Sequence, residues 1–169
     1  SQKRTITSGF VYNADGSAND LNDIKERWVL DFLKNRKSKG KVIIFSAYTR
    51  EMERLEAHLN IPCIRAGKDY NAEIEKFNKT GVLCISAQLS EGLNLQCADT
   101  IIFMSNSSSP VKKLQAEGRI IRPYNPNDTL YIYELVCKDT MDEEGLQQLD
   151  NHITEDSKIL GELDVKKNV

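Results

Sequence analysis

Four short runs of β-branched and aromatic residues, separated by longer amphipathic segments, constrain most strongly what this chain can fold into. The runs are residues 41–46, 82–86, 100–104 and 129–136, with a shorter one at 62–64. The first three are almost continuously apolar, which is typical of strands buried on both faces of a parallel sheet. The run at 129–136 alternates more and indicates a strand nearer the sheet margin. Strands that alternate with helices predict an α/β domain whose mainly parallel sheet is covered on both faces.

Polar side chains follow these runs, where the carboxyl ends of the strands are expected. Ser46, Ser86, Gln88 and Ser105 lie there, and Arg65 follows the shorter run. In open parallel sheets ligands bind beyond the carboxyl ends of the strands. The sequence therefore predicts a polar binding edge, and we expect the helix that follows Ser105 to start from the same edge.

The helix expected after the third run carries two arginines at helical spacing. Pro110 suits the first helical position and Pro123 disfavours continuation, which predicts a helix from about residue 110 to Arg122. Gln115, Arg119 and Arg122 then share one face. The face beside it carries an apolar stripe of Val111, Leu114, Gly118 and Ile121. Paired guanidiniums suit a polyphosphate, although a solvated cationic helix edge explains the same pattern.

Apolar periodicity predicts further helices and sets the domain limits. A helix over about residues 20–35 is expected to turn inward Leu21, Ile24, Trp28, Leu30 and Phe32. Thr49 can cap the next helix, and a helix is also expected from about residue 140 onward. Residues 1–19 are interpreted as a connector that contains an apolar patch at 10–12 and forms one brief strand or a docked hook. Residues 20–160 are interpreted as one domain and residues 161–169 as a frayed tail.

Composition limits the classes of function. The chain has 169 residues, of which 40% are hydrophobic, and a formal net charge of −2. This charge argues against a domain that coats nucleic acid, so any such contact is expected to be local. The four cysteines form no C-x-x-C pair, which predicts free thiols and no metal site. The sequence shows no signal peptide and no apolar run of roughly 20 residues, so we expect an intracellular protein without a membrane partner.

Two ordered motifs give the chain a family resemblance. Residues 86–95, Ser-Ala-Gln-Leu-Ser-Glu-Gly-Leu-Asn-Leu, resemble motif V of superfamily 2 helicases, and residues 115–122 fit the motif VI pattern Gln-x-x-Gly-Arg-x-x-Arg. Residues 41–46 resemble motif IV, and residues 65–67 the short motif after it. From about residue 20 to 160 the chain is similar to the second RecA-like lobe of these helicases, and most similar to the Swi/Snf-like branch. The resemblance implies a RecA-like three-layer α/β/α fold.

The resemblance also implies a role for each matching residue. Arg119 and Arg122 match the arginine fingers that approach the γ-phosphate from across the cleft between lobes, and Gln115 matches a residue that helps order this phosphate network. The positions that face the nucleotide are matched by Gly92 and Asn94, with Glu91 as a relay between sites. The positions that touch the nucleic-acid backbone are matched by Ser46, Ser86, Gln88 and Arg65. The alternative for each is an ordinary polar loop residue or helix cap.

The resemblance also implies a cofactor and partners, and a motif that the sequence lacks bears on where the cofactor is bound. It contains no G-x-x-x-x-G-K-[ST] phosphate loop. The resemblance implies that ATP and Mg²⁺ are bound mainly by a first lobe outside this sequence, so the lobe alone is expected to be inactive. The implied partners are nucleic acid, with DNA favoured over RNA, and the N-terminal RecA-like lobe of the same polypeptide. The predicted function is the second motor lobe of an ATP-dependent DNA helicase or translocase.

Two departures from the Swi/Snf-like pattern qualify this resemblance. Pro123 follows Arg122 where that branch continues differently, and the pair Ser90-Glu91 replaces small glycines. The departures argue against a close match to chromatin remodellers and suggest a viral or bacterial relative. Two alternatives stay open. One is a nucleic-acid-binding module that kept the fold without motor activity, and the other is an unrelated doubly wound domain that binds a small ligand.

Overall fold

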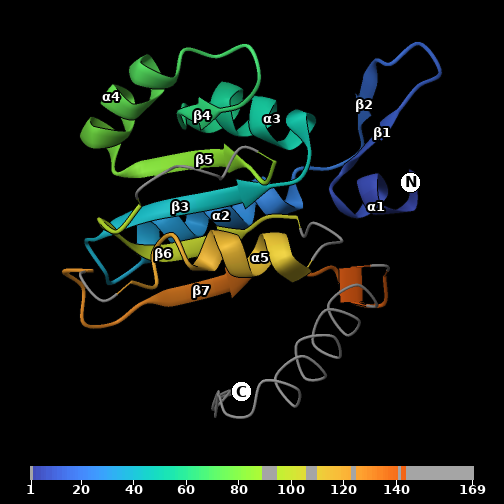
Figure 1. The fold of residues 1–169 in the computed structure, drawn as a ribbon. Helices are drawn as coiled ribbons and strands as arrows, with labels where there is room; N and C mark the ends of the chain where they lie inside the picture. Colours follow the sequence, from blue (N-terminus) through green and yellow to red (C-terminus); the bar gives the residue numbers. More distant parts are fainter. Residues whose placement is uncertain (1, 89–94, 106–109, 123–124, 141, 144–169) are drawn as a thin grey trace.

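A five-stranded parallel sheet forms the centre of the molecule (Figure 1). The computed structural model describes residues 2–88, 95–105, 110–122, 125–140 and 142–143. In spatial order the strands are β4 (Cys63–Ile64), β5 (Val82–Ser86), β3 (Lys41–Ser46), β6 (Ala98–Phe103) and β7 (Tyr131–Glu134). Every neighbouring pair in this sheet is parallel, which confirms the predicted class. β3 lies in the middle and β7 at an edge, as their sequence patterns predict.

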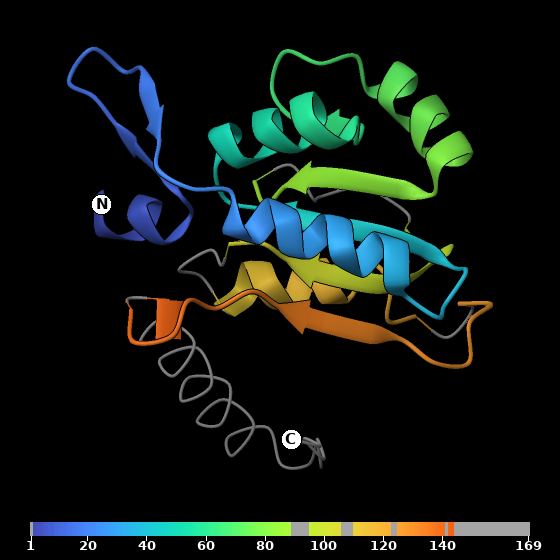
Figure 2. The ribbon, with the colours of Figure 1, turned by 180° about the vertical axis from the view of Figure 1, so that it is seen from behind.

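Helices cover both faces of this sheet. α2 (Ile24–Asn35) and α3 (Thr49–Leu59) pack on one face, which Figure 2 shows from its own side. α4 (Tyr70–Thr80) and α5 (Pro110–Glu117) pack on the opposite face. The predicted three-layer α/β/α arrangement is therefore present.

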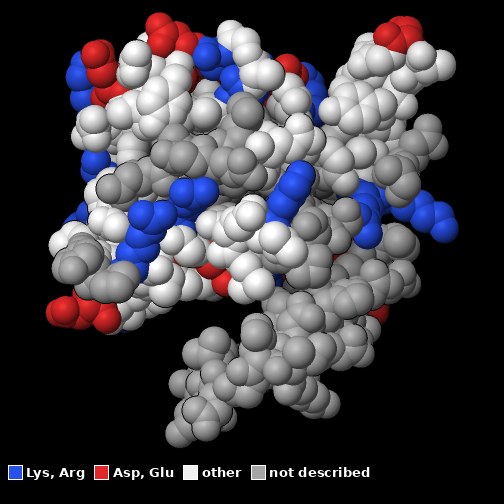
Figure 3. Space-filling view, viewed as in Figure 1, with Lys and Arg blue, Asp and Glu red and all other residues white. Residues whose placement is uncertain are grey.

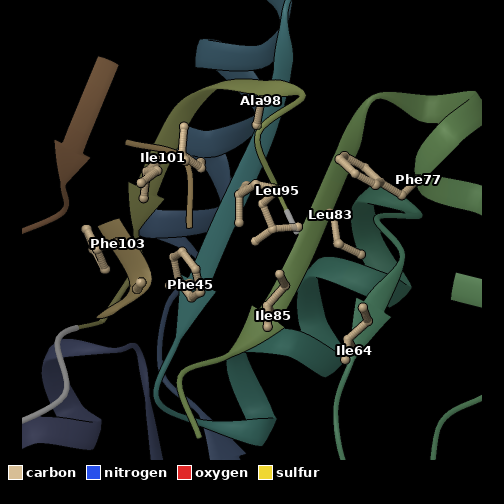
Figure 4. Packing of buried hydrophobic residues seen from close by; sticks show 12 residues of the cluster. Phe45, Ile64, Phe77, Leu83, Ile85, Leu95, Ala98, Ile101 and Phe103 are labelled. Carbon is tan, nitrogen blue, oxygen red and sulfur yellow. The ribbon is translucent and has the colours of Figure 1, made fainter. Parts of the chain in front are cut away.

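Each face has its own hydrophobic cluster, because successive side chains of a strand point to opposite faces. Ile43 and Phe45 of β3 point into the cluster beneath α4 and α5, whose packing Figure 4 shows. Val42 and Ile44 point into the cluster beneath α2 and α3. All four side chains are at most 1% exposed. Burial on both faces explains why this run is continuously apolar rather than alternating.

The residues before α2 form a small unit of their own, which we call the N-terminal hook (residues 2–20). It contains α1 (Gln2–Thr7) and the antiparallel strands β1 (Phe10–Tyr12) and β2 (Ala18–Asp20). A strand is present at 10–12, and its partner is formed by Ala18 and Asn19 of the predicted connector and by Asp20, where a helix was expected to start. Gly9 turns the chain at φ +81°, and a Cβ there would lie 2.5 Å from the carbonyl oxygen of Asn22. Glycine is required at this point.

Arg54 of α3 attaches the N-terminal hook to the helix layer. Its side chain is only 3% exposed and donates to the carbonyl oxygens of Ser8 at 3.2 Å and Gly9 at 2.9 Å. It also pairs with Glu26 of α2, which is buried, and lies 3.3 Å from a carboxylate oxygen of Asp20. One buried guanidinium therefore joins α3, α2 and both ends of the hairpin.

The inward face of α2 differs from the prediction. Three apolar residues that were expected to face inward are exposed: Leu21, Ile24 and Trp28. Val29 is buried together with the charged residues Lys25 and Glu26. The reason is that both charges have partners from distant parts of the chain: Glu26 pairs with Arg54, and the Lys25 ammonium donates to the Met104 carbonyl oxygen at 2.9 Å. Specific partners outweigh the apolar periodicity here.

Trp28 packs along the side of α2 toward the edge of the sheet. Its ring stacks on Phe32, with centroids 5.2 Å apart, and lies 6.0 Å from the ring of Tyr133 on β7. Phe32 meets the same tyrosine edge-on at 4.8 Å. These three rings connect α2 to the edge strand.

α5 is shorter than predicted. It ends at Glu117 rather than near Arg122. Beyond it the backbone tightens, since the Arg119 amide donates to the Ala116 carbonyl oxygen three residues back. Gly118 stands where the helix stops, and glycine is a poor helix former.

α5 also buries a different stripe from the predicted one. Three of the four stripe residues are at least half exposed: Val111, Leu114 and Ile121. Ala116 and Ile120 face the sheet instead, and Lys113 is buried with them. The Lys113 ammonium lies 5.8 Å from the centroid of the Phe103 ring and pairs with Glu134 of β7. A partnered lysine stem thus covers the sheet where an apolar side chain was expected.

The cap predicted for α3 is also wrong. Thr49 is the first helical residue, and Tyr48 takes the cap position without a side-chain cap hydrogen bond. Asp69 shows what a cap looks like in this chain, since its carboxylate accepts from the amides of Asn71 and Ala72 at the start of α4.

Replacing Arg54 with alanine should lower the free energy of unfolding by about 3–5 kcal/mol, because Glu26 would be left buried without its cation. The matched control is Arg50→Ala on the same helix, where the guanidinium is 31% exposed. This control should cost about 1 kcal/mol or less. Urea unfolding of both variants checks the prediction, and equal costs would contradict the buried role of Arg54.

Candidate functional site

Four of the predicted site residues meet at one edge of the sheet. Ser46 and Ser86 are register partners at the carboxyl ends of β3 and β5, and the Ala87 amide donates to the Ser46 carbonyl oxygen at 2.9 Å. Gln88 follows on the same segment, and its amide lies 3.4 Å from the Ser86 hydroxyl. Arg65 comes directly after Ile64 of β4, which pairs with β5. We call Ser46, Arg65, Ser86 and Gln88 the rim residues.

The rim residues differ in what they offer to a ligand. Gln88 is exposed and Ser86 is half-buried. An Arg65 guanidinium nitrogen lies 3.3 Å from a carboxylate oxygen of Glu56, while its Nε is buried without a partner among the described residues. Lys68 and then Arg65 lower the pKa of the Glu56 carboxyl. Ser46 is fully buried, so its hydroxyl supports the edge from below in this conformation.

Glu51, in the first turn of α3, is the group on which Ser46 rests. The Ser46 hydroxyl donates to Glu51 Oε2 at 2.6 Å, and the Ser105 hydroxyl donates to the same oxygen at 2.5 Å. Ser105 in turn accepts the Ala47 amide at 2.8 Å. The Glu51 side chain is fully buried, and burial raises the pKa of its carboxyl against the opposing effect of Lys25.

The arginine pair lies away from the rim residues. After α5 the Asn125 side chain donates to the carbonyl oxygens of Ala98 at 3.1 Å and Ile120 at 2.9 Å. Ala98 is the first residue of β6, so the segment that carries Arg119 and Arg122 lies at the amino ends of the strands. The expectation that α5 starts at the rim edge is consistent with its position after Ser105. The arginines, however, follow the end of this helix and lie at the opposite edge.

The two arginines differ in their environment. Arg119 is half-buried, and its Nε is buried without a hydrogen-bond partner in the described parts of the chain. Arg122 is exposed, and its Nε donates to the Gly118 carbonyl oxygen at 3.0 Å. Gln115 is exposed on α5. Lys and Arg side chains gather on this face over the end of α5 (Figure 3). The arrangement can meet an anion that approaches the face covered by α5.

Three predicted residues, Glu91, Gly92 and Asn94, lie outside the described residues. The chain that follows them is described from Leu95, which is buried in the same cluster as Ala116 and Ile120. Leu95 therefore lies on the sheet face that α5 covers.

Sequence reasoning missed the buried charges Lys25 and Glu51. Neither was named as a candidate, and only distant partners explain them. The Lys25 ammonium lies 3.1 Å from a carboxylate oxygen of Asp142, beside its bond to the Met104 carbonyl oxygen. Glu51 had one signal, an acidic residue in the first turn of a helix, which is equally expected from the helix dipole.

The sequence also predicted free thiols, no metal site and no membrane partner. Cys63 and Cys84 are buried free thiols, as predicted, and burial raises the pKa of the Cys84 thiol well above its usual value. Cys97 is exposed and Cys137 is half-buried. No metal-binding cluster of His, Cys, Asp and Glu occurs among the described residues. Within the same residues, none of the helices combines the length and the apolar character needed to span a bilayer.

A parallel sheet between two helix layers, in the strand order given above, defines a RecA-like α/β domain. The structure is similar to that of the C-terminal part of the Fun30 ATPase domain, with a TM-score of 0.60 and 26% identity, covering 73% of this chain and 44% of that one. The model of the helicase conserved C-terminal domain matches residues 24–124. The chain belongs to this family.

Curated relatives agree with this assignment. The chromatin-remodeling ATPase INO80 of Homo sapiens is 29% identical over 147 residues, 79% of this chain but 9% of that protein. The ATP-dependent helicase fft1 of Schizosaccharomyces pombe is 27% identical over 143 residues, 78% of this chain and 15% of that protein. The chain thus spans a small part of these relatives. They are eukaryotic and include a remodelling ATPase, so the viral or bacterial origin suggested by Pro123 and Ser90 has no support here.

Substituting Glu51 with glutamine should change how stability depends on pH. Because burial raises the pKa of Glu51, the folded state holds this proton more tightly than the unfolded state. The wild-type protein therefore loses stability as pH rises above the unfolded value of about 4.3 and through the raised folded one. Glutamine does not titrate. We expect the free energy of unfolding of Glu51→Gln to increase relative to wild type over this window, and a pH-independent difference in urea unfolding would contradict it.

Proposed function

We propose that this chain acts as the second motor lobe of an ATP-dependent helicase or translocase that moves on DNA. Membership of the helicase C-terminal family supports this proposal, as do relatives whose names describe ATP-dependent helicases and remodelling ATPases. The observation that carries it is the unpartnered, buried Nε of Arg119 within the described residues. A buried donor without an acceptor is costly, and an incoming anion would satisfy it.

The side chains of the arginine segment suit the phosphate groups of a bound nucleoside triphosphate. ATP supplies the γ-phosphoryl group that is transferred to water. Arg119 and Arg122 would contact its charged oxygens from this lobe, since guanidinium forks match phosphate geometry. Gln115, exposed on the preceding helix, would donate or accept a hydrogen bond beside them. We assign Mg²⁺ and most of the nucleotide contacts to the N-terminal RecA-like lobe of the same polypeptide.

The rim residues are proposed to contact the nucleic-acid backbone. Gln88 and Ser86 offer short amide and hydroxyl donors at an accessible edge, and Arg65 adds a cation there. Groups of this kind position a protein on phosphates without reading sequence. The net charge of −2 restricts the contact to such a local edge. Ser46, buried beneath them, orders the edge, and Glu91, Gly92 and Asn94 remain predicted nucleotide contacts.

Arg119→Ala and Arg122→Ala, each made in a protein that contains both lobes, should lower DNA-stimulated ATP turnover by about 10³-fold or more. The transition-state charge would lose its guanidinium partner. Lys112→Ala serves as the control, since this exposed lysine lies on the same helix and should leave turnover within about twofold. Steady-state ATPase assays check this. Near-normal turnover by a folded Arg119→Ala variant would reject the arginine role.

Ser86→Ala and Gln88→Ala should weaken binding of duplex DNA without changing sequence preference, because each removes a backbone contact. Arg65→Ala should in addition lower the slope of log affinity against log salt by about one unit. Fluorescence anisotropy with labelled duplex DNA and duplex RNA measures both effects. Glu75→Gln on the exposed side of α4 is the control. Unchanged binding in all three rim variants would place the nucleic acid elsewhere.

A further inference from the structure

The rim edge and the start of the arginine-bearing segment are connected beneath the surface by one chain of hydrogen bonds. It begins at the Ala87 amide after β5, which donates to the Ser46 carbonyl oxygen. From the Ser46 hydroxyl it passes to Glu51 Oε2, and from that oxygen to the Ser105 hydroxyl after β6. Ser105 closes a loop by accepting the Ala47 amide at 2.8 Å. One carboxylate oxygen thus joins the ends of β3 and β6, and a backbone hydrogen bond adds the end of β5.

Fold stability alone is a poor explanation for a carboxylate at this position. Glu51 is fully buried, and its second oxygen, Oε1, has no hydrogen-bond partner among the described residues. Burial raises the pKa of this carboxyl and Lys25 opposes the rise, but the Lys25 ammonium bonds to Met104 and Asp142 instead. A buried carboxylate without a bonded cation destabilises the folded state. An apolar residue of similar size would destabilise it less. What Glu51 contributes is a fixed arrangement of the strand ends.

Glu51 joins the end of β3, at Ser46, to the end of β6, at Ser105. The end of β3 is bonded in turn to the segment after β5, through the Ala87 amide and the Ser46 carbonyl oxygen. β5 ends in Ser86, and Ser86 and Gln88 are proposed to touch nucleic acid. β6 continues through Ser105 toward α5, which carries Gln115 and leads to the arginine pair. The short hydrogen bonds at Oε2 are those of hydroxyls bound to a carboxylate, which are among the stronger ones in proteins. A shift of either strand end would therefore be felt at the other.

We infer that Glu51 is a positioning residue that couples the nucleic-acid edge to the arginine segment. It contacts neither nucleic acid nor nucleotide. It holds the ends of β3 and β6 in one arrangement, and the end of β5 follows through its backbone bond to Ser46, so that occupation of the rim residues sets the position from which α5 departs. This inference rests on the proposed function, since it assigns a regulatory link within that same site.

The test uses a protein with both lobes and measures the ratio of DNA-stimulated to basal ATP turnover. In Glu51→Leu, which removes both hydroxyl contacts, this ratio should fall at least tenfold and the half-saturating concentration of duplex DNA should rise. Glu51→Gln keeps one acceptor oxygen and should show an intermediate loss. Glu53→Gln, at a partly exposed position on the same helix, is the control and should keep the wild-type ratio. Damage to the fold alone would lower basal and stimulated turnover together and leave the ratio unchanged.

Ser105→Ala gives a second route to the same link if the leucine variant fails to fold. It removes one hydroxyl and should lower the ratio, and its effect should not add to that of Glu51→Gln, because both act on one oxygen. Additive losses, or an unchanged ratio in both variants, would overturn the coupling role. The proposed function is judged separately. If Arg119→Ala abolishes turnover while the Glu51 variants keep their ratio, the motor assignment stands and the coupling fails.

Discussion

The pairing of Arg54 with Glu26 inside the α2–α3 layer is the interaction on which the arrangement of the carboxyl edge depends. Neither charge is stable in the interior without the other. Arg54 also fixes the N-terminal hook, and from there the Thr7 hydroxyl reaches Asp142, 2.6 Å away in the segment after β7. Asp142 in turn binds Lys25. A series of buried and half-buried polar contacts therefore runs from α3 through the hook and Asp142 to α2, and Lys25 extends it to Met104, just after β6.

The strands were predictable and the inward faces of the helices were not, for a physical reason. A strand that is buried on both faces can be recognised from its own apolar residues alone, so the run at 41–46 identifies β3 directly. The orientation of α2 depends on partners of Lys25 and Glu26 that lie in other elements. Apolar periodicity contains no information about those partners. The prediction based on it therefore placed Ile24 on the inward face, which in the structure carries Lys25 and Glu26.

The candidate site was predictable in its parts but not in its layout. Parallel register brings Ser46, Ser86 and Arg65 to one edge, as the order of the strands implies. The helix that leads to the arginines was expected to start from the same edge. A crossover helix runs back along the strands, and each residue advances it by about 1.5 Å. Over the length of α5 this advance leads toward the other end of the sheet, where the segment with Arg119 and Arg122 lies.

Trp28 is an intrinsic fluorescence probe of this chain. It is the single tryptophan of the chain, and it stands where α2 meets the edge strand through Phe32 and Tyr133. Its indole is 37% exposed, so its emission depends on how closely those two elements pack. Fluorescence of the unmodified protein will therefore follow separation of α2 from β7 first. Local unfolding of the hook or of the rim residues will not change the Trp28 emission unless it also disturbs the contact between α2 and β7.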